Sequence, residues 1–172
     1  MSDCADNGVA WRRVITPILK QMGVVVLDPT AKPIEIGVED SKARGVLAAM
    51  KADGKIAEAR EAMKVIRRVD LRCIDLSSFV IVRLDGTPTV GTYEEIAMSV
   101  SQSKPTLIWL DGKLNKNNVS DWILAQVPLE YLFESMDDLV AYLRRIDSSE
   151  KHPEDRRWML FDLARLYREV LI

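Results

Sequence analysis

Three short apolar runs divide the chain and predict β-strands. They cover residues 24–27, 79–82 and 106–110. The runs are rich in β-branched residues, they are continuous rather than alternating, and Gly, Asp or Pro residues bound them. This pattern is typical of strands that are buried on both faces of a parallel sheet. A further run at residues 129–133 predicts a last short strand.

Apolar residues at helical spacing lie between and after these runs. They predict helices within residues 11–22, 41–69, 93–102, 136–146 and 156–172. Pro17 favours a kink or a late start in the first of these segments, and Asp53-Gly54 favours a turn that divides the second into two helices. Because strands alternate with helices, the sequence predicts an α/β layer fold with a mainly parallel sheet.

The length of 172 residues is enough for one compact domain, and two domains would both be undersized. We therefore predict a single domain over residues 1–172, with a helical tail from about residue 154. The tail is amphipathic and needs an apolar partner, which is either the chain's own sheet or a second copy of the chain. Both interpretations stay open.

The charge pattern disfavours a polyanionic partner. The 24 basic and 26 acidic residues give a net charge of -2 and are interspersed along the chain, which argues against binding to a nucleic-acid polymer or an anionic membrane surface. No apolar run approaches the roughly 18 residues of a membrane-spanning helix. Residues 1–7 have neither the basic nor the apolar region of a secretory signal, so we expect a cytoplasmic protein.

Few cysteines and histidines are present, which excludes several mechanisms. Cys4 and Cys73 form no CxxC pair, so they indicate neither a disulfide framework nor a zinc site. The single histidine, His152, lies in a polar stretch before the tail, and this disfavours Ser-His-Asp, Cys-His and histidine–metal chemistry. The carboxylates follow no recognisable metal-ligand pattern, so we expect no metal and no cofactor.

The segment after the second predicted strand is the richest in candidate chemistry. In open α/β sheets, ligands bind at the carboxyl ends of the strands. Residues 83–95 contain Asp85, small residues and hydroxyls, and then Glu94 and Glu95. We expect both glutamates in the first turn of a helix, where unpaired N–H groups and the helix dipole stabilise a carboxylate. Glutamates are also common in first turns that have no catalytic role.

A second acidic cluster precedes the same strand. It is the segment Asp70-Leu71-Arg72-Cys73-Ile74-Asp75. Asp70 could cap a turn or pair with a neighbouring arginine (Arg67, Arg68 or Arg72), and salt bridges are the more common use of such residues.

Several segments are informative through their order and spacing. They are Trp11-Arg12, Gly23-Val24-Val25-Val26-Leu27-Asp28-Pro29, Asp70-Leu71-x-x-Ile74, Val90-Gly91-Thr92-x-x-Glu95-Ile96 and Lys104-Pro105, with an apolar strand before and after the last two. Together they resemble the nucleoside 2-deoxyribosyltransferase family over about residues 10–110. The resemblance implies a flavodoxin-like three-layer fold, a covalent ribosyl-enzyme intermediate and active sites completed across a subunit interface.

The resemblance also implies roles for individual residues. The nucleophile falls on Glu95, four residues after Gly91, rather than on Glu94. Asp70 matches the aspartate at the nucleobase, where it can help to protonate the leaving base. Gly91, Thr92 and Glu94 are then expected to contact the substrate. An ionised Glu95 would attack the anomeric carbon, and water or a second base would resolve the intermediate with net retention.

The chain differs from the family pattern at its start and before the nucleophile. Only residues 1–7 precede the first predicted helix, where the family has a strand and a sugar-binding turn, so Asp6 and Asn7 are substitutes for that turn. Six residues before Glu95 stands Thr89. A hydroxyl there is similar to related nucleotide N-glycosidases and favours a 5′-monophosphate, whereas Asp85 supports the alternative of a free nucleoside.

The family's subunit-crossing asparagine has three candidates, Asn115, Asn117 and Asn118, of which we select Asn117. Each is equally compatible with a solvated loop. Taken together, these segments predict an enzyme that cleaves or transfers the N-glycosidic bond of a nucleoside or nucleoside 5′-monophosphate. Its partners would be that small molecule and further copies of the chain, in a homodimer or higher homo-oligomer. The alternative is a non-catalytic nucleotide-binding or sensing module on the same fold.

Overall fold

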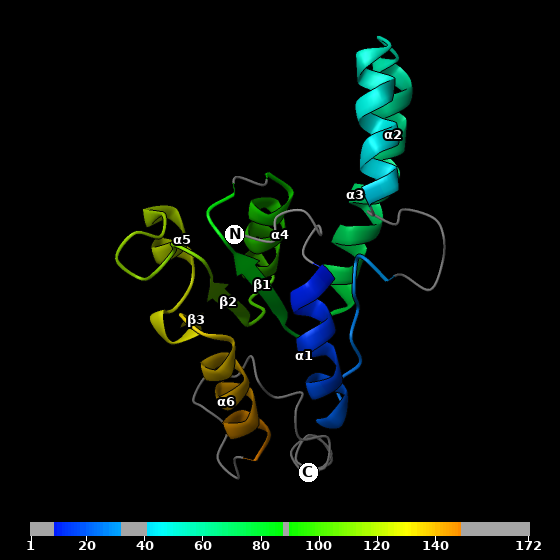
Figure 1. Cartoon of the computed structure of the whole chain (residues 1–172). Helices are drawn as coiled ribbons and strands as arrows, with labels where there is room; N and C mark the ends of the chain where they lie inside the picture. Colours follow the sequence, from blue (N-terminus) through cyan, green and yellow to red (C-terminus); the bar gives the residue numbers. More distant parts are fainter. Residues whose placement is uncertain (1–8, 32–40, 88–89, 149–172) are drawn as a thin grey trace. The chain divides into compact units, whose positions relative to one another are not determined.

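The computed structural model of the chain describes residues 9–31, 41–87 and 90–148. It divides into two compact units, Met1–Ser77 and Ser78–Ile172, which we describe separately. Within the described ranges, the first unit holds three helices, and the second holds a sheet with its own helices (Figure 1). The predicted single domain stays a prediction. His152 and the predicted tail lie outside the described residues.

The first helix, α1 (Val9–Gln21), agrees with the predicted segment at 11–22. Its inner face carries the buried Ile15 and Leu19, which are four residues apart and therefore lie on one side of the helix. Pro17 lies inside the helix with its ring exposed. The helix is thus defined by its apolar spacing despite the proline.

The strand predicted at residues 24–27 is wrong. These residues form neither helix nor strand in the structure. Val25 is 85% exposed and Leu27 is 42% exposed, whereas a strand of a parallel sheet would be covered on both faces. Val24 donates its backbone N–H to the carbonyl of Leu19, so the segment begins by closing the end of α1.

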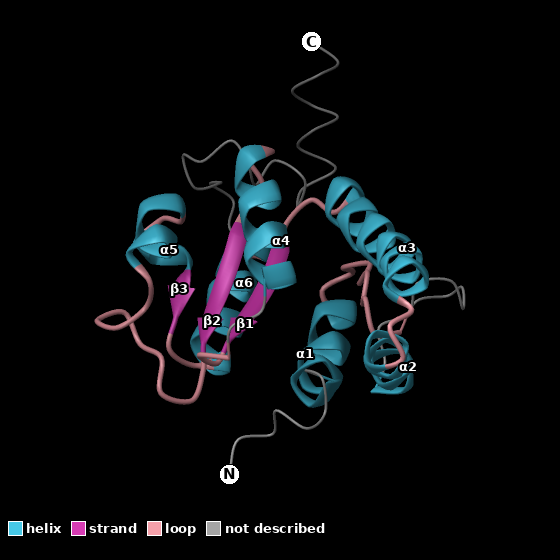
Figure 2. Ribbon diagram, turned by 90° about the horizontal axis from the view of Figure 1, so that it is seen from above, coloured by secondary structure: helices cyan, strands magenta, loops and turns pink. Residues whose placement is uncertain are grey.

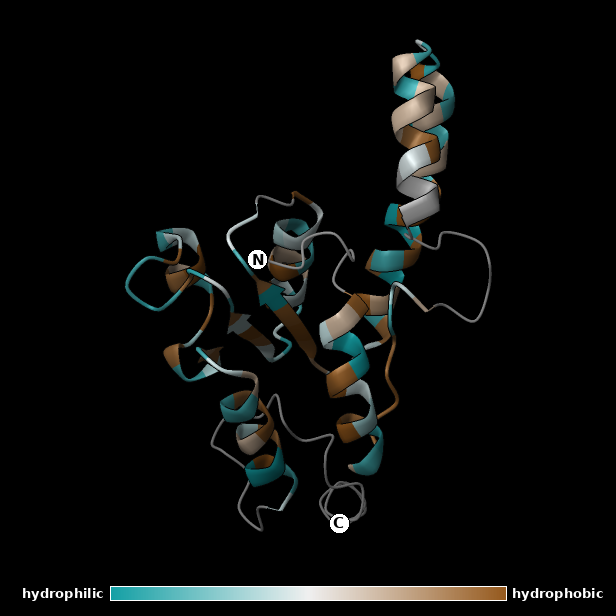
Figure 3. Cartoon of the chain, viewed as in Figure 1, coloured by the Kyte–Doolittle hydropathy of each residue, from teal (hydrophilic) through white to brown (hydrophobic). Residues whose placement is uncertain are grey.

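Two antiparallel helices, α2 (Ser41–Ala52) and α3 (Ile56–Leu76), form a hairpin, as the Asp53-Gly54 signal predicts (Figure 1). Gly54 has a φ of +74°, a conformation that glycine adopts without steric cost, and this allows the tight turn. The core of the hairpin is Leu47, Ala59 and Ile66. Figure 3 shows brown and teal residues alternating along both helices, as expected for a pair with one narrow apolar seam.

The second unit is built on a sheet of three parallel strands in the order β1-β2-β3. They are β1 (Val80–Leu84), β2 (Thr106–Leu110) and β3 (Leu132–Phe133). The α/β class and the parallel sheet are therefore confirmed. In the register, Arg83 lies beside Trp109, and Leu84 lies beside Leu110.

Helix α4 (Val90–Ser101) links β1 to β2 and covers one face of the sheet. Ser99 of α4 hydrogen-bonds Thr106 of β2, so the face that carries Thr106 lies under α4. Side chains alternate along a strand, and Trp109 therefore points to the other face. Phe133, beside Trp109 in the register, packs on Tyr142 of α6 (Met136–Asp147). Helices α4 and α6 thus lie on opposite faces (Figure 2).

Between β2 and β3 the chain forms a polar loop, the short helix α5 (Asp121–Gln126) and the 3₁₀ turn η2 (Leu129–Tyr131). The pattern at 129–133 thus divides into a turn and a two-residue strand. The core of this unit consists of almost fully buried side chains: Ile96, Leu107, Ile108, Leu110, Ile123, Leu132, Leu139 and Leu143. Throughout the described ranges, no helix is long and apolar enough to cross a membrane.

Candidate functional site at the carboxyl edge of the sheet

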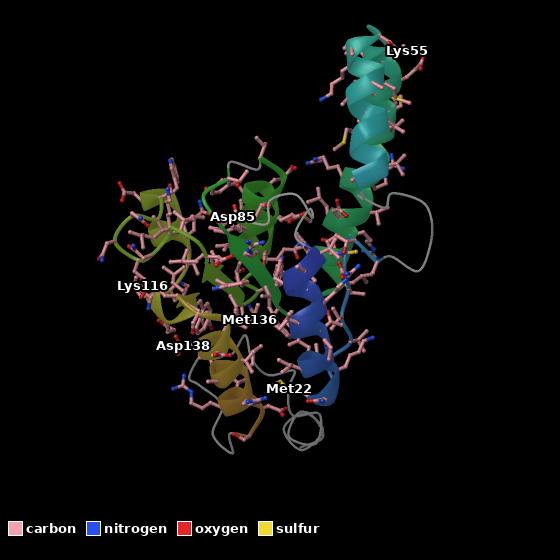
Figure 4. All side chains as sticks on the ribbon, viewed as in Figure 1. Met22, Lys55, Asp85, Lys116, Met136 and Asp138 are labelled. Carbon is pink, nitrogen blue, oxygen red and sulfur yellow. The ribbon has the colours of Figure 1, made fainter. Side chains whose placement is uncertain are left out.

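An acidic residue follows each of the three strands. Asp85 comes directly after β1, Asp111 after β2 and Glu134 after β3. Since the strands are parallel, their carboxyl ends lie at the same edge of the sheet, which is where ligands bind in open α/β folds. Figure 4 places Asp85 beyond the end of β1 and Lys116 in the loop that follows β2. This edge is the candidate site of the second unit.

Arg83 of β1 binds the first two of these carboxylates. Its Nε donates a hydrogen bond of 2.7 Å to Oδ2 of Asp111, and its Nη2 lies 2.7 Å from the same oxygen. The Nη2 atom is also 3.7 Å from Oδ2 of Asp85. The guanidinium carbon lies 5.6 Å from the centre of the Trp109 ring, so the charge also rests over an aromatic face. The Arg83 guanidinium therefore interacts with two carboxylates, Asp85 and Asp111, at the ends of neighbouring strands.

The loop after β1 turns sharply towards α4. Oδ1 of Asp85 accepts the backbone N–H of Thr87 at 2.9 Å, as aspartates commonly do at turns. Gly86 between them has a φ of +84°, which a residue with a side chain adopts only with strain. The predicted substrate residue Asp85 is thus held in place by the turn and by Arg83. Thr89 lies outside the described residues.

The structure corrects the position of Glu94 and Glu95. Because α4 begins at Val90, they are its fifth and sixth residues, and its first turn holds no acidic residue. The unpaired N–H groups of a helix belong to its first four residues. The predicted stabilisation of the two carboxylates by these groups and by the helix dipole is therefore wrong.

Helix geometry nevertheless directs Glu95 towards the sheet. Thr92, Glu95 and Ser99 are spaced three and four residues apart and share one side of α4. Ser99 is fully buried against Thr106 at the amino end of β2, and Thr92 and Glu95 are half-buried. At about 1.5 Å per residue, Glu95 lies about 6 Å and Thr92 about 10 Å beyond Ser99, along a strand of about 13 Å. Along the strand direction, Thr92 therefore lies about 3 Å short of the carboxyl edge, and Glu95 lies about 7 Å short of it, at the level of the middle of β2.

Gly91 and Glu94 lie on the same first part of α4. Gly91 is exposed, and no atom lies within 4 Å of where its Cβ would be, so space is open there. Glu94 is half-buried. The predicted residues Gly91, Thr92, Glu94 and Glu95 therefore occupy one continuous part of α4.

The loop after β2 holds the predicted residue Asn117. Its backbone N–H binds Oδ1 of Asn115, and the N–H of Asn115 binds Oδ1 of Asn118. The N–H of Lys116 binds Oε1 of Glu134, which ties this loop to the end of β3. Asn117 is exposed. The asparagines therefore stabilise the loop itself, and a role of Asn117 at a subunit interface stays a prediction.

Asp70 belongs to the first unit and lies in α3. Since α3 continues to Leu76, Asp70 does not cap a turn before the strand, and that alternative is wrong. Asp70 is 9% exposed, so it is a buried polar residue of α3 rather than a surface carboxylate. The neighbouring Arg72 lies 3.6 Å from Asp75. Asp6 and Asn7 lie outside the described residues.

Two further features concern metals and thiols. In the ranges 9–31, 41–87 and 90–148, no group of three or more His, Cys, Asp or Glu residues could hold a metal ion. In those ranges Cys73 is half-buried and forms no disulfide.

Comparison with known proteins finds no matching family model, no matching curated protein and no matching solved structure.

The sequence pattern did not indicate Arg83 or Glu134. Arg83 is the one charged residue of β1, and its partner Asp111 is 28 residues away. The signal that could have identified Arg83 is its position as a charged residue at the end of an apolar run. Glu134 follows a strand of only two residues, which has too little periodicity to place its end.

Proposed function

We propose that the chain cleaves or transfers the N-glycosidic bond of a nucleoside or nucleoside 5′-monophosphate, with Glu95 as nucleophile. The proposal includes the flavodoxin-like three-layer fold that the resemblance implies for the chain. The observation that carries it is that Glu95 is half-buried in α4, the helix that follows β1, on the side of the helix that also carries the buried Ser99. The resemblance of residues 90–96 to the deoxyribosyltransferase pattern supports the same residue.

In the proposed reaction, the Glu95 carboxylate attacks the anomeric carbon and forms an ester bond as the C–N bond breaks. The base leaves with the electron pair of that bond and takes up a proton. Water or a second base then attacks the same carbon from the opposite side, and the ester bond breaks to return the carboxylate. Two displacements give net retention at the anomeric carbon.

The neighbouring residues suit the binding of a sugar. Thr92 offers a hydroxyl about 3 Å short of the edge along the strand direction, and Gly91 leaves room for a ligand to approach the backbone. The Asp85 carboxylate is fixed by the Thr87 N–H and lies near the Arg83 guanidinium, so it can accept a hydrogen bond from a sugar hydroxyl without first being ordered. The role of Asp70 as the acid that assists the leaving base belongs to this proposal as a separate residue test.

The test is release of free base. The full chain is incubated with a panel of nucleosides and 5′-monophosphates, with and without an acceptor base, and the products are separated by chromatography. We expect release by the wild type and a loss of at least about 10³-fold in Glu95→Gln, because the nucleophile is removed. Glu94→Gln is the matched comparison: Glu94 is expected to contact the substrate without forming the covalent bond, so this variant should lower release far less than Glu95→Gln.

Each other outcome has a defined meaning. If Glu94→Gln abolishes release and Glu95→Gln does not, the nucleophile is Glu94. If every variant and the wild type are inert while a nucleotide raises the melting temperature, the chain is a nucleotide-binding module. Asp70→Asn, assayed on the same panel, should slow release of poor leaving groups more than of good ones, as expected for a proton donor.

A further inference from the structure

We propose that Arg83 is a positioning residue for the reaction proposed above, acting through the loop that joins β1 to α4. The inference rests on that proposed function for its kinetic consequence, and on the ion pairs at the edge of the sheet for its structural one. Arg83 is not part of the segments that resemble the nucleoside 2-deoxyribosyltransferase family.

Arg83 cannot act by touching Glu95. Thr106 faces α4, so Leu110, four residues along β2, faces α4 as well, and Leu84 lies beside it in the register. Arg83 therefore projects to the opposite face, together with Trp109, over which its guanidinium lies. Its influence on α4 must pass through the residues that follow β1.

The contacts of Arg83 connect two strand ends. Asp111 is the first residue after β2, and its N–H donates to the Leu84 carbonyl at 2.7 Å. The carboxylate of the same Asp111 binds Arg83, whose Nη2 also faces Asp85. The side chain of Arg83 is only 13% exposed, so water screens these contacts less than it screens surface pairs. Arg83 thus fixes the first residue of the β1–α4 loop to the end of β2.

Asp85 and Thr87 come shortly before the start of α4 in the chain. Asp85 holds the Thr87 N–H, and α4 begins at Val90, three residues later. Without Arg83, Asp85 and Asp111 would be two carboxylates at adjacent strand ends with no guanidinium between them, and their repulsion would displace the loop. A displacement of about 1 Å at a reacting group costs about 10²-fold in rate. Such a displacement would reach Thr92 and Glu95 through the helix.

The variants are Arg83→Met, which removes the charge, and Arg83→Lys, which keeps the charge but not the paired N–H geometry. Arg144→Met on α6 is the matched control, because Arg144 is exposed and belongs to the same unit. Two measurements are made on the full chain. Hydrogen exchange is followed by mass spectrometry in peptides covering residues 84–93 and 136–147, and base release is measured as kcat and KM.

We expect exchange in the 84–93 peptide to rise about tenfold or more in Arg83→Met, the effect of losing a hydrogen bond to a charged group. Exchange in the 136–147 peptide should stay as in the wild type. We expect kcat to fall about 10- to 100-fold with a much smaller change in KM, and Arg83→Lys should recover part of both effects. Arg144→Met should behave as the wild type in both.

Wild-type exchange in the 84–93 peptide of Arg83→Met would overturn the proposal. An equal rise in both peptides would also overturn it, because it would show a general loss of stability. Unchanged kcat in a folded Arg83→Met would overturn the kinetic part. If the wild type releases no base, the proposed function fails, and the exchange pattern alone decides whether Arg83 holds the loop.

Discussion

The buried hydroxyl pair of Ser99 and Thr106 holds α4 against the sheet, and its removal gives a sharp test of the fold. The two oxygens are 2.7 Å apart, and both residues are at most 1% exposed. Oγ1 of Thr106 donates to the Lys104 carbonyl at 3.1 Å, so its single proton is used there and Ser99 must donate to Thr106. The pair therefore forms a directed hydrogen-bond chain from α4 to β2 at a position that is closed to bulk solvent.

The magnitude follows from which groups lose a partner. Thr106→Val keeps the shape of the side chain but leaves the Ser99 hydroxyl without its acceptor and removes the hydrogen bond to the Lys104 carbonyl. We therefore expect the free energy of unfolding to fall by about 2–3 kcal/mol. Ser99→Ala leaves Thr106 bonded to Lys104 and should cost about 1 kcal/mol. In the double variant no hydroxyl is stranded, so its cost should be about 1–2 kcal/mol below the sum of the two single costs.

The assay is urea unfolding of the full chain, followed by circular dichroism and tryptophan fluorescence. In thermal unfolding, each 1 kcal/mol should lower the melting temperature by about 2–4 °C. The control is Ser101→Ala on the exposed end of the same helix, which should change stability by less than about 0.5 kcal/mol. If the two single costs add up to the cost of the double variant, the hydroxyls are not coupled and the reasoning is refuted.

Two further predictions concern the core of the second unit and the surface of the first. Leu139→Ala should cost about 3–4 kcal/mol, because Leu139 is fully buried under the sheet, whereas Val90→Ala, at a position 87% exposed, should cost less than about 0.5 kcal/mol in the same urea assay. On α3, the Lys64 ammonium bonds to Glu61 and holds the pKa of that carboxyl below its ordinary value of 4.5. The contribution of this Glu61–Lys64 pair to the stability of the fold is therefore present above pH 4.5, and it is lost as the pH falls through the lowered pKa of Glu61. Lys64→Met should raise the pKa of Glu61 towards its ordinary value in an NMR titration, while Arg60, whose Nη1 lies 2.8 Å from Oε1 of Glu61, keeps part of the lowering. An unchanged pKa of Glu61 would show that Lys64 is not the main cause.

Much of the local structure follows from the sequence alone. The strand predicted at residues 106–110 has the same bounds as β2, and the hairpin turn at Asp53-Gly54 is where the sequence places it. The helix predicted at residues 136–146 is α6 with one residue more. These elements are defined by local signals, namely continuous apolar character, helical spacing and a turn with glycine, and these signals do not depend on distant residues.

The errors arise where burial or pairing depends on residues far along the chain. Residues 24–27 and 106–110 have similar apolar character, but only the second run has neighbouring strands on both sides. Glu94 and Glu95 are predicted in the first turn of a helix, but α4 begins earlier than the apolar spacing indicates. Both glutamates therefore lie beyond its first turn.

The α/β class and most helices could be predicted from the sequence, and the site at residues 83–95 stays a prediction. Only the folded structure shows that Glu94 and Glu95 lie beyond the first turn of α4, and that Arg83 joins the ends of β1 and β2 through Asp111. The physical reason is the range of the interactions. Periodicity reports which face of a single element avoids water, whereas an ion pair across 28 residues forms only when the parallel register brings two strand ends together.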